Sequence, residues 1–301
     1  MEFTVVGNGC SSARSRLKKT ARRIVPDHIW RLLREAARQR RQRRAAASLR
    51  RLRSRFEAFP SGTKGSHRLL DYTVSFNHGL VCFLLYQDIF VNRIYQFDAV
   101  RPDPLILDCG SNIGISVLYF KHLYPRARVL AFEPDPELFP LLEENVRANG
   151  LTDVTSYQVA VAGEEGTLRL FADGKVGSSL SAKPSGSGNG EANACEVSAV
   201  RLGPYLREPV DFLKMNIEGA EWEVIEDMEP NLRRIREMVI EYHHLPGMPR
   251  TLHKILAVLD RQGFEYCVSD FGLAAYGGNR PPVRLGPDAR YFRHLYAFRI
   301  E

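Results

Sequence analysis

The sequence predicts an α/β fold: a doubly wound, mostly parallel sheet that ends in a C-terminal antiparallel hairpin and is preceded by a basic, helical N-terminal arm. Short β-rich runs alternate with helical patterns between residues 105 and 262, and this alternation is typical of βαβ units. Two strand-like runs, 263–270 and 291–300, then close the chain. A chain of 301 residues with 44% hydrophobic content can bury one sizeable core.

The N-terminal arm, residues 1–60, carries the excess of positive charge. It holds 17 of the 42 basic residues but only 4 of the 35 acidic ones, so the remainder of the chain is acidic. Apolar residues recur at helical spacing within residues 12–59, which predicts two amphipathic helices, the first beginning near Pro26. The Pro, Gly and Ser content of residues 60–66 predicts a boundary, so the main domain is expected to span residues 67–301.

The elements of the main domain are expected in a regular order. The predicted strands are LILDC (105–109), ARVLAF (127–132), VTSYQVAV (154–161), DFLKMNI (211–217) and REMVIEY (236–242). The predicted helices lie near 113–122, 136–149, 220–228 and 250–262. A Gly- and Ser-rich insertion over residues 174–194 interrupts the series.

The spacing of the cysteines and the lack of long apolar runs disfavour a disulfide-rich secreted protein, a zinc protein and a membrane-spanning protein. The five cysteines have neither Cys-x-x-Cys nor Cys/His spacing (Cys10, Cys82, Cys109, Cys195 and Cys267), which predicts free thiols rather than disulfides or a zinc site. No run of about 18 apolar residues is present, and the first residues lack the order of a secretory signal. We therefore expect a soluble, cytoplasmic protein.

The segment 108–114 (DCGSNIG) predicts a ligand-binding loop. Gly110 and Gly114 stand where the chain turns from a strand into a helix, at the edge where open α/β sheets bind ligands. Glu133 ends the next strand, at the position where an acid hydrogen-bonds the two ribose hydroxyls of an adenosine. A diphosphate needs amide donors, whereas Asp108 and Glu133 present carboxylates. These acids suit a cofactor with an ammonium and a sulfonium group better than NAD.

Five segments resemble, in order, the motifs of the FkbM family of methyltransferases: LILDCGSNIGISVLYF, VLAFEPDPELFPLLEENVRANGL, VAV, DFLKMNIEGAEWEVI and VIEYHH. The most specific is DFLKMNIEGAE, which carries Asn216 where the family has an aspartate. The resemblance implies a Rossmann-like class I methyltransferase fold, S-adenosylmethionine as cofactor, and methyl transfer to a hydroxyl of a sugar, glycolipid or polyketide-like small molecule. The residues expected to bind the cofactor are Asp108, Gly110, Asn112, Gly114, Glu133 and Asn216.

The acceptor is expected at the ends of the fourth and fifth strands, where Asn216, Glu218 and Glu221 face Glu241 and His243. Glu221 falls in the first turn of the next helix, where an acid can also serve only as a complement to the helix dipole. An alcohol is a very weak acid, so a base or a metal ion is needed, and His243 has a suitable pKa for a general base. Glu218 and Glu241 would orient this histidine or bind a divalent ion. Asn216 removes one charge and weakens the metal interpretation. A histidine that only hydrogen-bonds a loop is the competing interpretation.

Two other functions remain open. The arginines of the arm would neutralise phosphates in a nucleic-acid methyltransferase, but the fourth strand ends in NIEG instead of the Pro-Pro-aromatic turn that holds a base. Alternatively, the chain is a cofactor-binding protein whose residues 12–59 dock on an anionic membrane surface. The sequence disfavours the first and leaves peripheral contact with the inner face of the membrane as an expectation.

Overall fold

The computed structural model describes residues 27–172, 178–180, 194–245, 247–269 and 291–300. The chain divides into two units, Met1–Ala58 and Phe59–Glu301. In the first unit a single helix, α2 (Asp27–Glu57), replaces the two helices expected from the sequence. It begins next to Pro26 as predicted, and it continues because no Gly or Pro interrupts it.

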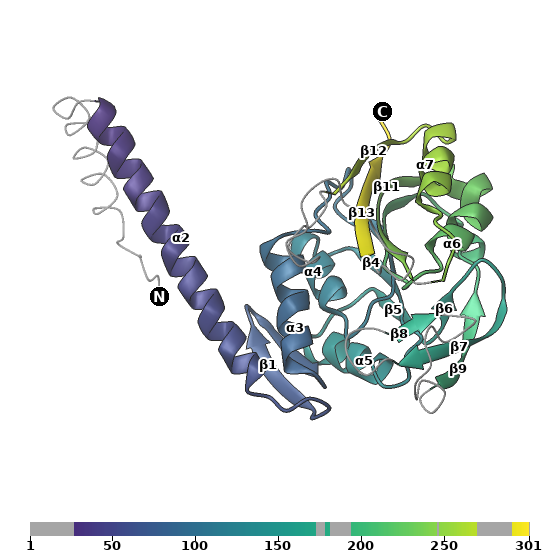
Figure 1. Ribbon diagram of the computed structural model, residues 1–301, viewed down its shortest axis with the longest axis horizontal. Helices are drawn as coiled ribbons and strands as arrows, with labels where there is room; N and C mark the ends of the chain where they lie inside the picture. The colour runs from purple at the N-terminus through teal and green to yellow at the C-terminus, as the bar shows by residue number, and fades with distance from the viewer. Residues whose placement is uncertain (1–26, 173–177, 181–193, 246, 270–290, 301) are drawn as a thin grey trace, which may run out of the picture. The chain divides into compact units, whose positions relative to one another are not determined.

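The second unit is built on a seven-stranded sheet with the order β12-β13-β11-β10-β3-β4-β5 (Figure 1). The strands are β3 (Leu105–Cys109), β4 (Arg128–Phe132), β5 (Val154–Tyr157), β10 (Val210–Met215), β11 (Ile235–His244), β12 (Glu265–Val268) and β13 (Tyr291–Phe298). Strands β3, β4, β5, β10 and β11 are parallel, while β13 runs antiparallel to both β11 and β12. The fold class predicted from the sequence, including the C-terminal hairpin, is confirmed.

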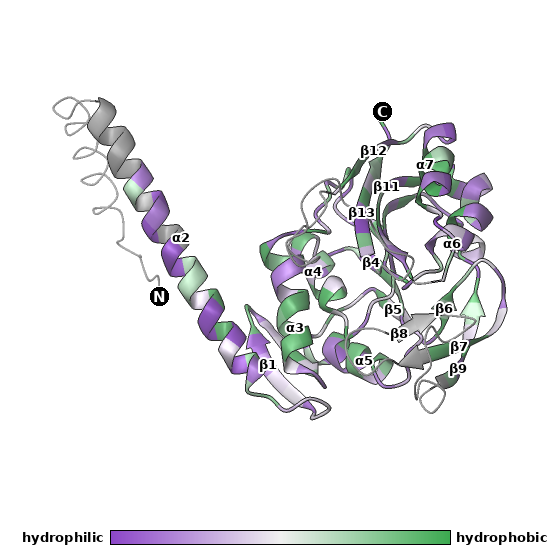
Figure 2. Cartoon of the chain, in the orientation of Figure 1, coloured by the Kyte–Doolittle hydropathy of each residue, from purple (hydrophilic) through white to green (hydrophobic). Residues whose placement is uncertain are grey.

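Helices cover both faces of this sheet. They are α3 (Gly79–Tyr86), α4 (Ile115–Leu123), α5 (Phe139–Ala148), α6 (Glu221–Met228) and α7 (Leu252–Arg261). Helices α3 and α4 lie on one side of the sheet, and α6 and α7 on the other (Figure 1). Every residue of β3 and β10 is buried, as expected for parallel strands between two helical layers. Helix α3 is apolar along its whole length (Figure 2).

Several elements were not predicted from the sequence. A hairpin of β1 (Gly65–Leu69) and β2 (Tyr72–Phe76) precedes α3, and a π-helix, η1 (Gln87–Val91), follows it. A second sheet has the order β6-β9-β7-β8, from β6 (Ala160–Val161), β7 (Gly166–Ala172), β8 (Ser178–Leu180) and β9 (Ala194–Val200). Of the insertion expected at 174–194, only β8 and the first residue of β9 lie within the described residues. Short 3₁₀ turns, η3 (Gly203–Tyr205) and η4 (Glu229–Arg234), complete the unit.

Two further expectations concern cysteines and membrane spans. The four cysteines in the described part of the chain are all free thiols, and Cys10 lies outside it. None of the helices described is both long enough and apolar enough to cross a bilayer.

Candidate active site

A cavity of about 390 Å³ opens where β3, β4, β10 and β11 end. Because these strands are parallel, their carboxyl ends meet at one edge of the sheet, which is where such folds bind ligands. Six of the residues singled out in the sequence line this cavity: Gly110, Asn112, Glu133, Asn216, Glu218 and Glu241. The other three, Asp108, Gly114 and His243, are not among the residues that line it.

The segment 108–114, which we call the glycine loop, contains two glycines whose backbone lies very close to another part of the chain. Gly110 has φ +78°, and a Cβ atom there would lie 1.8 Å from the carbonyl oxygen of Asn216. Gly114 has φ +86°, and its Cβ would lie 2.7 Å from the side chain of Leu142 on α5. Only glycine fits either position without a shift of its neighbours. Gly114 therefore shapes the start of α4 and does not face the cavity.

Glu133 ends β4 and is only 6% exposed, although it lines the cavity. Its Oε2 accepts a hydrogen bond from the amide of Asn112 at 2.7 Å, and its Oε1 accepts one from the amide of Asp135 at 3.0 Å. Burial raises the pKa of Glu133 to about 7, and the two backbone hydrogen bonds only partly oppose that effect. Each oxygen keeps a further lone pair with which it can accept a ligand hydroxyl.

Asp108 is fully buried, and its carboxyl group is used within the protein. The Ser116 hydroxyl donates to Oδ2 at 2.5 Å, and Lys214 Nζ lies 3.1 Å from Oδ1. Lys214 also donates to the carbonyl oxygens of Cys109, at 3.2 Å, and Gly110. The direct cofactor contact expected of Asp108 therefore has no support in the cavity geometry.

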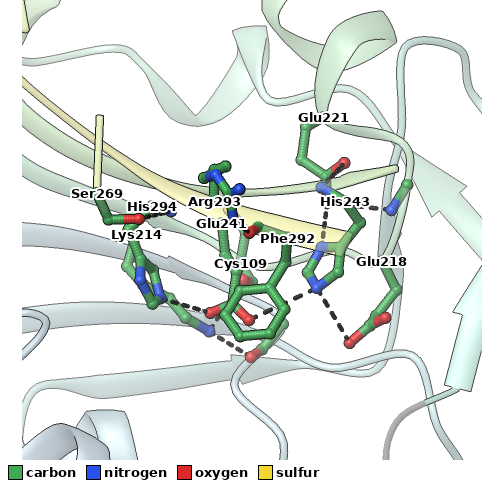
Figure 3. A network of polar contacts seen from close by, with 12 residues as sticks. Cys109, Lys214, Glu218, Glu221, Glu241, His243, Ser269, Phe292, Arg293 and His294 are labelled. Atoms are coloured by element: carbon green, nitrogen blue, oxygen red, sulfur yellow. Dashed lines mark hydrogen bonds and ion pairs between the residues drawn. The ribbon is translucent and has the colours of Figure 1, made fainter. Parts of the chain in front are cut away.

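Three glutamates surround His243; we call these four residues the His243 cluster (Figure 3). His243 Nδ1 lies 3.1 Å from Glu221 Oε1, while Nε2 lies 3.7 Å from Glu218 Oε1 and 3.5 Å from Glu241 Oε1. Burial disfavours the charged ring, but the hydrogen bonds and charges of these carboxylates outweigh it and raise the pKa of His243 well above its ordinary value. The three carboxylates therefore favour the protonated form of the ring.

Glu241 joins the His243 cluster to the last strand. Its Oε2 lies 3.1 Å from Nε2 of His294, which is the register partner of Glu241 in the antiparallel pair of β11 and β13. Burial alone would raise the pKa of Glu241, yet its contacts with His243 and His294 prevail and hold that pKa well below the usual range. A negative charge is thus maintained at the wall of the cavity.

Sequence reasoning missed two residues that the site uses and assigned a third only in part. Lys214 is a basic residue in the middle of a largely apolar strand, DFLKMNI, and such a position signals a buried ion pair. His294 alternates with Phe292, which lines the cavity, so period-two spacing could have placed both on one side of β13. Glu221 was expected at the acceptor site or as a first-turn acid of a helix; it is 1% exposed and holds His243 through Nδ1. No group of three or more His, Cys, Asp or Glu in the described ranges is arranged to hold a metal ion.

Comparison with known proteins decides the family. Residues 108–266, more than half of the chain, match the model described as Methyltransferase FkbM domain. The chain belongs to the FkbM family of methyltransferases. The matched range contains the glycine loop, Glu133 and the whole His243 cluster, and it supplies most of the residues that line the cavity; the others come from residues 81–95 and from Phe292. This FkbM-family protein is therefore an S-adenosylmethionine-dependent methyltransferase.

Relatives of this FkbM-family protein carry related names. Methyltransferase sdnD of Sordaria araneosa is 29% identical in an alignment 213 residues long that covers 60% of this chain and 81% of sdnD. The 31-O-demethyl-FK506 methyltransferase FkbM of Streptomyces tacrolimicus is 29% identical in an alignment 218 residues long that covers 60% of this chain and 80% of the relative. The 2-O-methyltransferase NoeI of Sinorhizobium fredii (strain NBRC 101917 / NGR234) is 28% identical over 158 residues, 47% and 64% of the two chains.

Among solved structures, methyltransferase FkbM from Methylobacillus flagellatus KT is similar with a TM-score of 0.45 and 15% identity. The similarity covers 71% of this chain and 48% of that one. Because the TM-score is below 0.5, the fold of this FkbM-family protein rests on its own strand order instead.

Proposed function

We propose that this protein transfers a methyl group from S-adenosylmethionine to a hydroxyl oxygen of a sugar, glycolipid or polyketide-like small molecule. One observation carries the proposal: a single cavity has the buried carboxylate of Glu133 on one wall and the carboxylates of Glu218 and Glu241 on another. The names of two relatives, the FK506 methyltransferase and the 2-O-methyltransferase, support oxygen as the methylated atom.

The donor groups of the cavity fit S-adenosylmethionine. Glu133 would accept hydrogen bonds from the ribose hydroxyls, because two backbone amides already hold its oxygens in place. Apolar side chains that share the cavity with Glu133 suit the adenine ring; they are Ile115, Phe132, Leu138, Ala160, Val161 and Leu170. Gly110 allows close approach to the backbone, and Glu218 and Glu241 offer negative charge to a cationic ligand. When bound, S-adenosylmethionine supplies a methyl group on a positively charged sulfur.

The residues of the His243 cluster would remove the proton from the hydroxyl group of the acceptor. Direct proton acceptance by His243 has little support, since the surrounding carboxylates favour its protonated form and it is not among the residues that line the cavity. We assign the acceptance of the hydroxyl proton to a carboxylate oxygen of Glu218, which lines the cavity, and not to Glu241, whose pKa is held well below its usual range and which is therefore the weaker base. Glu221 holds the ring through Nδ1, so the protonated Nε2 bridges those two carboxylates and keeps them together despite their like charge.

The first prediction tests this assignment with radiolabelled S-adenosylmethionine and a panel of hydroxylated small molecules. Once an acceptor is found, His243→Ala should lower turnover by about a hundred-fold or more, because Glu218 and Glu241 lose the cation between them. The affinity for S-adenosylhomocysteine should stay near the wild-type value, since Glu133 is unchanged. His253→Ala, at an exposed position on α7, is the matched control and should retain full activity.

A metal-centred mechanism gives a different pattern of results. A chelator would then abolish activity, and Glu218→Gln and Glu241→Gln would lose a bound ion together. If His243→Ala keeps full turnover and the chelator has no effect, neither mechanism holds. Positioning by Asn216, which lines the cavity beside Glu218, would be tested next.

A further inference from the structure

Lys214 is the basic residue among those that line the cavity, and the proposed chemistry leaves it unused. It lies on β10 beside Asp108 of β3, its register partner in the parallel pair. Its side chain is 3% exposed, although the residue contributes to the lining of the cavity. A cation so deeply buried must be matched by nearby acceptors, because desolvation costs several kcal/mol.

Three oxygen atoms from one short stretch of chain converge on the ammonium group of Lys214. They are Oδ1 of Asp108 at 3.1 Å, the carbonyl oxygen of Cys109 at 3.2 Å and the carbonyl oxygen of Gly110. The ring of Tyr95, 5.5 Å away, completes the surroundings of the cation. Without a cation, the three oxygens would repel one another across a site that water hardly reaches.

The conformation of the glycine loop depends on where these carbonyl groups point. The amides of Gly110 and Ser111 both donate to the carbonyl oxygen of Phe132, and the amide of Asn112 donates to Glu133. The amide side of the loop is therefore held by β4, and the carbonyl side is held by Lys214. A turn of the Gly110 carbonyl would move the backbone that lines the cavity and would also disturb the amide that fixes Glu133.

We propose that Lys214 is a positioning residue for the cofactor: its ammonium group holds the carbonyl oxygens of Cys109 and Gly110 and thereby sets the glycine loop in the shape that accepts S-adenosylmethionine. Asp108 serves as the counter-ion of Lys214 and does not contact the cofactor. This inference rests on the proposed placement of the cofactor in the cavity.

Two double variants separate loop positioning from charge balance. D108N/K214M and D108N/K214Q both remove the ion pair, and Met and Gln are similar in length, but only the Gln amide can donate to the two carbonyls. Affinity for S-adenosylhomocysteine is measured by calorimetry, and thermal unfolding is recorded for each variant. D108N/K214Q should bind up to about tenfold more tightly than D108N/K214M, at similar unfolding temperatures. Equal affinities would overturn the role of Lys214.

The single variants add a second, independent comparison. D108N keeps Lys214 on the carbonyl groups and retains the acceptor for Ser116, so it should lose less affinity than K214M. If Asp108 contacts the cofactor directly, the order is reversed, and that result overturns the proposal even if neither double variant folds. If the wild-type chain itself does not bind S-adenosylhomocysteine, the placement of the cofactor fails, which is a different outcome from either of these.

Discussion

Gly110 is the residue at which the site tolerates the least change. Gly110→Ala would place a methyl group 1.8 Å from the carbonyl oxygen of Asn216 and would force a side chain into φ +78°. The loop and the end of β10 must then separate, which should cost on the order of 3 kcal/mol or more. Chemical denaturation should show this loss of stability, and calorimetry should show a loss of S-adenosylhomocysteine binding.

Gly150 provides the matched control for that substitution. It also has a positive φ, +59°, but nothing lies within 4 Å of a Cβ atom there. Gly150→Ala should therefore cost only the backbone strain, about 1–2 kcal/mol, and leave ligand affinity unchanged. Similar losses of stability and binding in both variants would contradict the close approach at Gly110.

Glu133 makes cofactor binding depend on pH near neutrality. Its pKa of about 7 in the unliganded protein means that it is protonated in acid and ionised in weak alkali. The ionised form accepts hydrogen bonds on both oxygens, so binding favours it and releases a proton below that pKa. Affinity for S-adenosylhomocysteine should thus be level above pH 8 and fall by up to about tenfold per pH unit below pH 7.

Glu133→Gln distinguishes this carboxyl from other titrating groups. The amide has nearly the same shape but cannot ionise, so the variant should bind more weakly at pH 8 and show a much flatter pH profile. Calorimetry at several pH values checks both features. A wild-type affinity that does not change between pH 6 and pH 8 would argue against Glu133 as the ribose ligand.

The candidate site could be predicted in part from residues at strand ends. Glu133, Glu218 and Glu241 all line the cavity, because parallel strands bring their carboxyl ends to one edge whatever the distance along the sequence. The role of Asp108 was not predictable in the same way. Its burial depends on Lys214, which comes from a strand about a hundred residues later, and spacing within one segment carries no information about that pairing.

At the scale of elements, the charge pattern of α2 indicates how the arm interacts with other surfaces. Arginines occur around the whole circumference of α2 when its residues are placed at 100° intervals, so the helix lacks the single apolar face expected from the sequence. A helix of this kind attracts anionic surfaces by charge, with little insertion of apolar side chains. We propose that the arm makes peripheral contact with anionic membranes.

Sedimentation with vesicles tests the arm. The full chain should sediment with vesicles rich in anionic lipid at low salt and should not sediment with neutral vesicles. It should be released from the anionic vesicles as the salt concentration rises, because exposed charges are then screened. Deletion of residues 1–58 should abolish this binding; it keeps Phe59, whose ring packs at 5.0 Å from that of Phe76 in the second unit. Cofactor affinity should not change. Equal sedimentation of the two proteins would refute the role of the arm.

Elements were predictable from the sequence wherever local pattern and tertiary packing agree. The strand LILDC is apolar enough to be recognised alone, and its observed bounds are those expected. Strands β7 and β9 were missed, although Leu168 and Leu170 alternate with polar residues, because each is stabilised mainly by the other across a long insertion. The two helices expected in the arm are one for a different reason: the residues between the two apolar patterns contain no Gly or Pro, so the helix continues through them.

At the scale of the whole molecule, ligand binding should raise the stability of the second unit. S-adenosylhomocysteine at a hundred times its dissociation constant adds about 2.7 kcal/mol. For a domain of this size the unfolding temperature should rise by roughly 5–10 °C. Scanning fluorimetry checks the shift, and the chain without residues 1–58 should show the same one. Glu133→Gln at the same ligand concentration should show a smaller shift, and equal shifts would count against the cavity as the binding site.

The position of β13 has a consequence for how the protein is made. This strand, the last one described, lies inside the sheet between β11 and β12; it supplies Phe292 to the lining of the cavity and His294 as a partner of Glu241. During synthesis, one edge of β11 stays unpaired while some fifty further residues are added, until β13 leaves the ribosome. A nascent chain arrested before residue 291 would have the glycine loop and Glu133 but an open acceptor side, so the site is completed only after β13 has emerged and paired with β11.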